Sequence, residues 1–155
     1  MTDRYRPVPD KRHSYFIPAM APVYSGLSNF AEFALRVVVG LNLIPHGLQK
    51  LFGGLGGTAQ FLDASGFSPG FLWAVLVMAT ELVGGVFLIL GFATRPAALA
   101  VMLFMIVAAF FHSANGFLWD QGGFEYPLMW AVAAFYFLVR GGGPWSIDRR
   151  IGREF

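Results

Sequence analysis

The stretch FAEFALRVVVGLNLIPHGLQKLF, from Phe30 to Phe52, decides the fold class of this chain. It is apolar over a length that suits the hydrocarbon core of a bilayer, which a helix crosses in about 20 residues. No alternation with a period of two runs through it, so it does not resemble a strand of a membrane barrel. The stretch therefore predicts a transmembrane helix, although a proline, a histidine, a glutamine and a lysine stand close together within Pro45–Lys50.

Three further apolar runs follow along the chain: Phe71–Phe92, Pro96–Phe117 and Phe124–Arg140. Hydrophobic residues make up 56% of the 155 residues and charged residues only 13%, which is outside the range of ordinary soluble domains. We therefore expect an all-α fold, an integral membrane four-helix bundle. Residues 28–148 are predicted to form this transmembrane domain.

The positions of the basic residues predict how the bundle is oriented, because Lys and Arg resist translocation across the membrane. Nine of the eleven fall before the first run, between the second and third, or after the fourth: Arg4, Arg6, Lys11, Arg12, Arg95, Arg140, Arg149, Arg150 and Arg153. We expect both termini to be cytosolic. Residues 1–27 are predicted to be a basic, proline-containing tail without the apolar core of a cleavable signal, and residues 149–155 a short basic tail.

The composition also narrows the chemistry. The chain has no cysteine, which excludes disulfides, cysteine-ligated iron–sulfur clusters and covalent attachment of haem c within it. Basic residues are not interleaved with stacking aromatics on a soluble face, so nothing predicts nucleic-acid binding. A redox role would need a non-covalent cofactor and a partner protein, and the apolar helices are expected to contact membrane lipids.

Two ionisable residues stand deep inside the predicted spans, where charge is costly and usually finds a partner. With a helical rise of about 1.5 Å per residue, Arg36 and Glu81 fall at similar depths toward the cytosolic side. This predicts a buried structural ion pair between them, with a proton or substrate role as the alternative. Glu32 competes for Arg36, because a separation of four residues puts both on one helix face.

A second polar layer is predicted near the opposite surface. A spacing of four places three side chains of the first helix on one stripe, and the third and fourth helices bring two more to that level. Pro45 adds a defect, because it has no amide hydrogen to donate to the preceding turn. We predict a polar pocket, open to the non-cytosolic side and lined by Asn42, His46, Lys50, His112 and Glu125, with Gln49 at its rim.

Several occupants suit such a pocket. A quinone headgroup would find polar partners there and an apolar slot for its tail among Phe and Trp side chains. A b-type haem held by His46 and His112 is a weaker alternative, because two histidines on separate helices are little evidence. No metal site is predicted, since three or four converging ligands are missing. The structural alternative is a solvated helix end in which Glu125 caps the fourth helix.

The loop after the first span contains TAQFLDASGFSPG, residues 58–70. This segment predicts a short interfacial helix that covers the pocket, with Thr58 as its N-cap. Phe61 and Leu62 are expected to dip into the lipid.

Five motifs in this order resemble the successive signatures of the DoxX family: IPHGLQKLFGG (Ile44–Gly54), ATELVGGVFLILGFATRPAAL (Ala79–Leu99), FFHSANGF (Phe110–Phe117), GGFEYPLMW (Gly122–Trp130) and GGGPWSID (Gly141–Asp148). The resemblance covers Phe30 to Asp148. It departs from the family in the closing motif, which more often has glycine-proline-glycine before the serine. Here Gly143, Pro144 and Trp145 stand instead.

The resemblance implies a four-helix protein of the bacterial or archaeal inner membrane. Relatives are linked to quinone-dependent thiosulfate oxidation, to terminal quinol oxidase complexes and to oxidative-stress assemblies. The positions that match the family are His46, Lys50, Glu81, Arg95, His112 and Glu125.

Two functions of different classes remain. The chain is either the membrane subunit of a quinone-linked redox complex, whose partner supplies the redox centre, or a noncatalytic accessory or scaffold subunit. In the latter role it would pack against a larger membrane complex or form a homo-oligomer. A small transporter or channel subunit is a third interpretation.

Overall fold

The computed structural model describes residues 16–153 and residue 155, and every regular element in this part is helical. The segment Lys50–Gly54, which is kinked at Gly53, connects α1 to α2, and the π-helical segment Thr80–Gly84 connects α3 to α4. Short 3-10 turns lie at Pro18–Met20, Ser113–Asn115 and Trp119–Gln121. The helices are α1 (Ala21–Gln49), α2 (Leu55–Ala64), α3 (Gly70–Ala79), α4 (Gly85–Leu90), α5 (Thr94–His112), α6 (Glu125–Arg140) and α7 (Ile147–Arg150).

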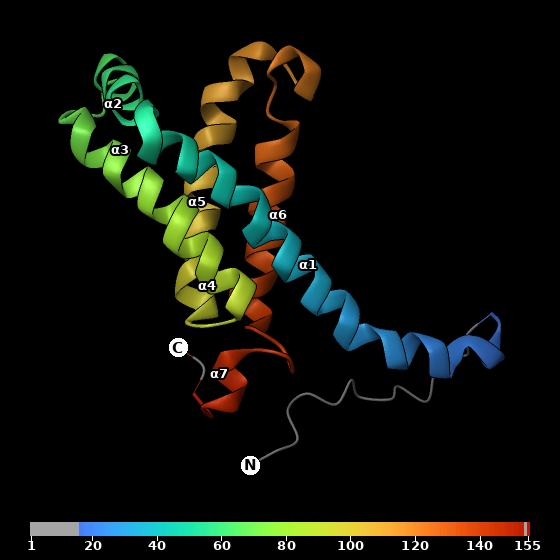
Figure 1. The fold of residues 1–155 in the computed structure, drawn as a ribbon. Coiled ribbons are helices and arrows are strands. Elements are labelled where there is room, and N and C mark those ends of the chain that lie inside the picture. Colours follow the sequence, from blue (N-terminus) through green and yellow to red (C-terminus); the bar gives the residue numbers. More distant parts are fainter. Residues whose placement is uncertain (1–15, 154) are drawn as a thin grey trace.

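Four long rods make up the molecule: α1, the continuous pair α3 and α4, α5, and α6 (Figure 1). This arrangement confirms the predicted all-α membrane bundle. By length and apolar composition, three stretches of the described part can cross a membrane: Pro18–Ala64, Gly70–Leu90 and Thr94–Asn115. The fourth rod, α6, is shorter, with 16 residues, and packs along α5.

The two ends of the bundle differ in the elements that close them. Figure 1 places α7, the turn between α4 and α5, and the start of α1 at one end, which we call the α7 end. The opposite end, the α2 end, carries α2 and the connection between α5 and α6. Four described arginines at or near helix termini belong to the α7 end, namely Arg95, Arg140, Arg149 and Arg150, whereas Lys50, the C-cap of α1, lies toward the α2 end. A cytosolic location for this end stays a prediction.

Helix α1 begins earlier than the apolar run that predicted it. It starts at Ala21, and Pro22 occupies its first turn, where a missing amide hydrogen breaks no helical bond. Figure 1 shows this first part projecting past the other helices, and Val23 and Leu27 on it are exposed. Within the predicted tail of residues 1–27, residues 21–27 are therefore helical. Residues 1–15 of that tail lie outside the described residues.

Glycines set the register between α1 and the rod formed by α3 and α4. A Cβ atom at Gly40 would lie 2.5 Å from the carbonyl oxygen of Gly85, and one at Gly47 would lie 2.6 Å from Cγ of Leu82. The two backbones can approach this closely only because these positions lack side chains. The contact at Gly47 also brings Glu81 beside the last turns of α1.

The core lies between α1, α4, α5 and α6, and its buried members are small or aliphatic apart from Phe137. The surface of the rods is rich in exposed apolar side chains, such as Phe110 and Val132. A lipid-facing surface accounts for that exposure, because the surrounding hydrocarbon is as apolar as the core. The core residues include Val39, Leu43, Leu88, Ala98, Val101, Ala134 and Phe137.

Arg36 lies fully buried near the α7 end. Its guanidinium donates to the carbonyl oxygens of Leu88 and Ile89 and to that of Trp145, at 2.9 Å for Ile89 and 2.8 Å for Trp145. The last carbonyls of a helix have no amide donors within it, so the cation satisfies the end of α4. The predicted ion pair of Arg36 with Glu81 is wrong, because the register places Arg36 about two helical turns beyond Glu81.

Asp148 completes the same end of the bundle. Its carboxylate accepts hydrogen bonds from the backbone amides of Ala93 at 2.7 Å and Thr94 at 2.9 Å, which begin α5. Its own amide donates to the carbonyl of Gly91 at 2.9 Å. Gly91 has φ of 66°, and a Cβ there would lie 2.5 Å from the Arg36 guanidinium. The closing SID motif thus clamps the turn between α4 and α5.

Candidate functional site

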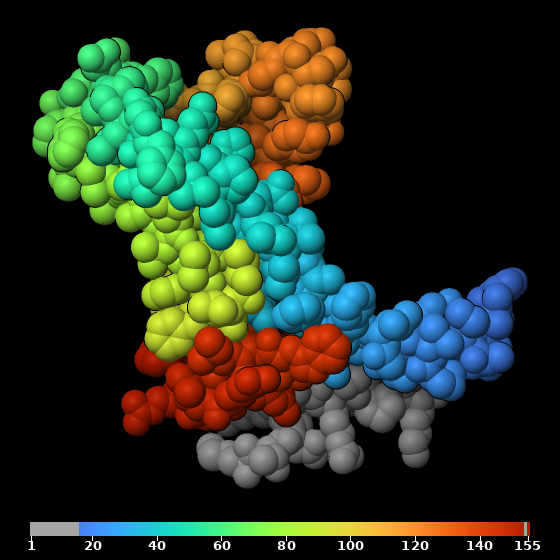
Figure 2. Space-filling view, viewed as in Figure 1, coloured from blue at the N-terminus to red at the C-terminus, as the bar shows by residue number. Residues whose placement is uncertain are grey.

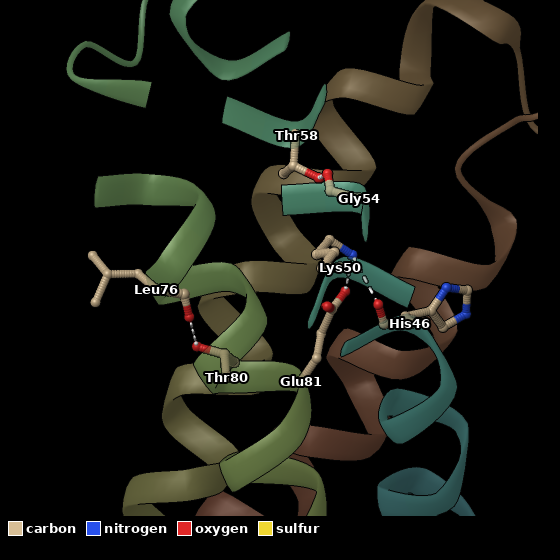
Figure 3. A network of polar contacts seen from close by, with 7 residues as sticks. All are labelled: His46, Lys50, Gly54, Thr58, Leu76, Thr80 and Glu81. Carbon is tan, nitrogen blue, oxygen red and sulfur yellow. Dashed lines mark hydrogen bonds and ion pairs between the residues drawn. The ribbon is translucent and has the colours of Figure 1, made fainter. Parts of the chain in front are cut away.

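Glu81 and Lys50 form an ion pair toward the α2 end (Figure 3). Lys50 Nζ lies 2.8 Å from Glu81 Oε1, and the two side chains are 18% and 4% exposed. The same ammonium lies 3.5 Å from the carbonyl oxygen of His46, whose ring turns away from the carboxylate. Glu81 belongs to the π-helical segment Thr80–Gly84, a departure from α-helix that recurs at functional sites. Lys50 begins the segment Lys50–Gly54, in which Gly53 with φ of 154° marks a kink after α1.

A cavity of about 1210 Å³ adjoins this pair. Its walls come from α1, α2, α3, α5, α6 and the connection between α5 and α6. Figure 2 shows a notch at the α2 end, between α2 and that connection. Both elements contribute residues to the cavity lining, among them Thr58 of α2 and Asn115 of the connection. Ligand pockets commonly measure about 300 to 1,000 Å³, so the cavity can admit a ring system. Its aromatic lining consists of Phe61, Phe104, Phe111, Trp119, Tyr126 and Trp130.

The structure brings together four of the five residues predicted to form the pocket: Asn42, His46, Lys50 and His112 all line the cavity. Glu125 does not line it. Instead, Glu125 Oε2 accepts a hydrogen bond from the backbone amide of Trp119 at 3.2 Å, and the carboxylate lies in the first turn of α6. An acidic residue there complements the helix dipole, but the N-cap of α6 is Phe124 and no side chain caps this helix, so Glu125 is not the cap that was considered for it. Gln49, predicted at the rim, is not part of the lining either.

His112 is held in one orientation by the connection that follows it. Its Nδ1 lies 2.6 Å from the carbonyl oxygen of Gly122, which also accepts from Asn115 Nδ2 at 3.2 Å. Because a carbonyl oxygen can only accept, the proton of a neutral ring must be on Nδ1. Nε2 of neutral His112 is therefore a hydrogen-bond acceptor, and His112 lines the cavity.

Glu81 carries a second acceptor. The residue is 3% exposed, and its Oε2 is buried with no hydrogen-bond partner among the described residues. Leaving a buried polar atom unsatisfied costs on the order of 1–3 kcal/mol. Since Glu81 lines the cavity, a ligand that donates a hydrogen bond to Oε2 would recover that free energy.

The sequence did not predict that Glu81 belongs to this site. The helical rise gives the depth of a residue along its own helix, but it does not show how far two neighbouring helices are shifted along each other. The small residues at Gly40, Gly47 and Gly85 were the available signal, since close backbone contacts fix how two helices slide. With that register, Glu81 would have been placed beside Lys50.

The interfacial helix was predicted in the right region, but its details differ. Helix α2 begins at Leu55 with Gly54 as its N-cap, and Thr58 instead donates its hydroxyl to the Gly54 carbonyl at 2.9 Å. Leu62 is buried against α3 rather than in lipid. Phe61 is exposed and lines the cavity, so α2 does cover the pocket.

These features define a small helical membrane protein with a cavity toward one end, whose mainly apolar walls carry an ion pair and two histidines. The chain belongs to the DoxX family, because the DoxX family model matches residues 31–114. This range runs from α1 through α5.

Three relatives extend the comparison. The Bacillus subtilis (strain 168) protein named "Putative oxidoreductase CatD" is 36% identical over 95 residues, 61% of this chain and 69% of that protein. The Escherichia coli (strain K12) "Inner membrane protein YqjF" is 28% identical over 131 residues, 83% of this chain and 98% of its own. An uncharacterised protein of Haemophilus influenzae (strain ATCC 51907 / DSM 11121 / KW20 / Rd) is 33% identical over 130 residues, 77% and 90% of the two chains. No solved structure matches this chain.

Proposed function

We propose that this chain is the membrane subunit of a quinone-linked redox complex, and that its cavity receives the quinone headgroup. The observation that carries the proposal is the cavity itself, where an ion pair and two histidines stand among apolar and aromatic walls. Such a lining suits a lipophilic ring with few polar atoms. The name of the Bacillus subtilis relative supports a redox role.

The residues present fit a quinone ring. Lys50, His46 and Asn42 carry N–H groups along one side of α1, and quinone carbonyl oxygens accept hydrogen bonds from such donors. Phe111 and Trp130 supply apolar surface for the ring. A bound quinone would carry electrons and protons. The chain's own part is to hold the headgroup at the depth of the ion pair while the tail remains in lipid.

A partner is part of the proposal. The chain has no cysteine and so cannot hold a cysteine-ligated cluster as the source of electrons. We place the complex in the cell inner membrane, with both termini of this chain cytoplasmic. The name of the Escherichia coli relative and the bias of basic residues toward one side support this placement.

The test begins with gentle solubilisation of the full chain from its native membranes. Extraction and chromatography should recover about one quinone per protein complex from the wild type and several-fold less from His46→Ala, in which a cavity-lining donor is removed. Arg140→Gln, at the α7 end, is the matched control and should retain the quinone. Recovery of the wild-type protein without quinone would contradict the proposal. A Soret band that disappears in His112→Ala would favour the haem alternative.

A second candidate, an accessory or scaffold subunit, is favoured by the first part of α1. This part projects past the bundle and exposes Val23, Tyr24 and Leu27, a surface that a partner helix could cover. Replacement of Leu27 by a photoreactive leucine in native membranes tests it. Cross-links to one defined protein would support this role, and cross-links to lipid alone would contradict it.

A further inference from the structure

We infer that the cavity holds the reduced, dihydroxy form of its aromatic ligand in preference to the dicarbonyl form, with Glu81 Oε2 accepting a hydrogen bond from a ligand hydroxyl. This inference rests on the proposed function, because it names the form of the ligand proposed there. It follows from the hydrogen-bonding capacity of the side chains that line the cavity.

Glu81 provides the main argument. Lys50 Nζ lies 2.8 Å from Oε1 and pairs with it as an ammonium with a carboxylate, while the buried Oε2 has no partner among the described residues. An ionised carboxylate accepts hydrogen bonds and cannot donate them. A quinone carbonyl likewise only accepts, so placing it against Oε2 would leave both atoms unsatisfied. A hydroxyl would satisfy Oε2 with a charge-assisted hydrogen bond.

His112 adds an independent acceptor from another helix. The carbonyl of Gly122, 2.6 Å from Nδ1, keeps the proton of the neutral ring on that nitrogen. Nε2 then presents a lone pair, and a hydroxyl can donate to it where a carbonyl cannot. Glu81 and His112 both line the cavity, from the Thr80–Gly84 segment and from α5.

The donors in the cavity do not reverse this preference. The Lys50 ammonium has three N–H groups, and two of them face Glu81 Oε1 and the His46 carbonyl. Asn42 gives one of its N–H groups to the Val38 carbonyl at 2.9 Å. Their remaining N–H groups can donate to a hydroxyl oxygen as well as to a carbonyl oxygen. The acceptors therefore discriminate between the two forms, and the donors do not.

The test compares a decyl-substituted benzoquinone with its hydroquinone, kept reduced without oxygen. Each is titrated calorimetrically into the full chain in nanodiscs, with empty nanodiscs subtracted. We expect the hydroquinone to bind at least about tenfold more tightly, because only it satisfies Oε2. Equal binding, or tighter binding of the quinone, would overturn this inference alone. Binding of neither form would overturn the proposed function as well.

Variants test whether Glu81 and His112 cause the preference for the hydroquinone. Glu81→Gln keeps the size of the side chain but can turn an amide N–H toward the ligand, so the preference should fall to about one. His112→Phe removes the second acceptor at an exposed position and should weaken the preference without unfolding the chain. Glu32→Gln is the matched control, because that carboxylate accepts hydrogen bonds from Arg140 and Tyr136 outside the cavity.

Should Glu81→Gln fail to fold, the wild-type comparison and His112→Phe still decide the question. An unchanged preference in His112→Phe and in folded Glu81→Gln would refute the assignment.

Discussion

Arg36 and Asp148 form hydrogen bonds with the backbone on the two sides of the turn between α4 and α5. Arg36 donates to the carbonyl oxygens at the end of α4, and Asp148 accepts from the amides at the start of α5. Each charge complements the dipole of the helix end that it meets. The two residues are 0% and 2% exposed and come from the first rod and from the closing motif. Segments distant in sequence therefore close the α7 end together.

Asp148→Ala should lower the free energy of unfolding by at least about 2 kcal/mol, because it removes a charged acceptor and leaves buried amides of α5 without a partner. Asp148→Asn keeps one oxygen and should lose less. Thermal melts in detergent measure both. The exposed Asp120→Asn provides a matched charge change and should melt like the wild type. An Asp148→Ala protein with the wild-type melting temperature would contradict the clamp.

Gly40→Ala should destabilise the bundle by about 1–3 kcal/mol, because a new Cβ would lie 2.5 Å from the Gly85 carbonyl oxygen and force α1 away from α4. Gly26→Ala is the control on the same helix, where nothing lies within 4 Å of the added atom. It should be neutral, or stabilising by up to about 1 kcal/mol. Equal melting temperatures for the two variants would mean that the glycine contact does not set the register.

Lys50→Met should destabilise the protein by about 3–5 kcal/mol, because it leaves the Glu81 carboxylate buried without its counter-charge. Adding Glu81→Leu to this variant should restore most of the loss, since an apolar pair of similar volume needs no compensation. Unfolding curves of the single and double variants give the coupling free energy. Additive effects of the two substitutions would contradict a direct pair.

Arg140→Gln should change stability by less than about 1 kcal/mol, even though Arg140 donates to Glu32 at 2.8 Å. The Arg140 side chain is 53% exposed, so solvent and headgroups can replace its partner. Measuring Lys50→Met in the same assay compares the contribution to stability of this exposed ion pair with that of an enclosed one. A loss as large as that of Lys50→Met would show that the α7 end depends on this contact.

The fold could be predicted from the sequence because the four apolar runs are long and continuous. The pocket could be predicted in part, since the spacing of Asn42, His46 and Lys50 fixes one stripe whatever the neighbouring helices do. The partners of Arg36 and Glu81 could not, because they depend on how far two helices slide past each other. That slide is set by backbone contacts at glycines, which carry no polar signal.

Two other features depended on local geometry that composition does not reveal. Glu125 has the right depth for the pocket. Its carboxylate instead accepts a hydrogen bond from the Trp119 amide, which the turn before α6 brings beside it. The early start of α1 was missed because the segment after Ala21 is less apolar than the run from Phe30 onward, although its residues are compatible with a helix.

Helix α6 has 16 residues and so extends about 24 Å, against a hydrocarbon thickness of about 30 Å. If α6 crosses the membrane, as the apolar run Phe124–Arg140 predicts, the bilayer has to become thinner beside this short helix, or headgroups have to reach down to the Arg140 guanidinium at its end. The length of the lipid acyl chains, which sets the thickness of the bilayer, would then act on the side of the protein that α6 forms. Because α6 also contributes Trp130 to the cavity wall, the thickness of the host membrane would tune how easily a lipophilic ligand enters from that flank.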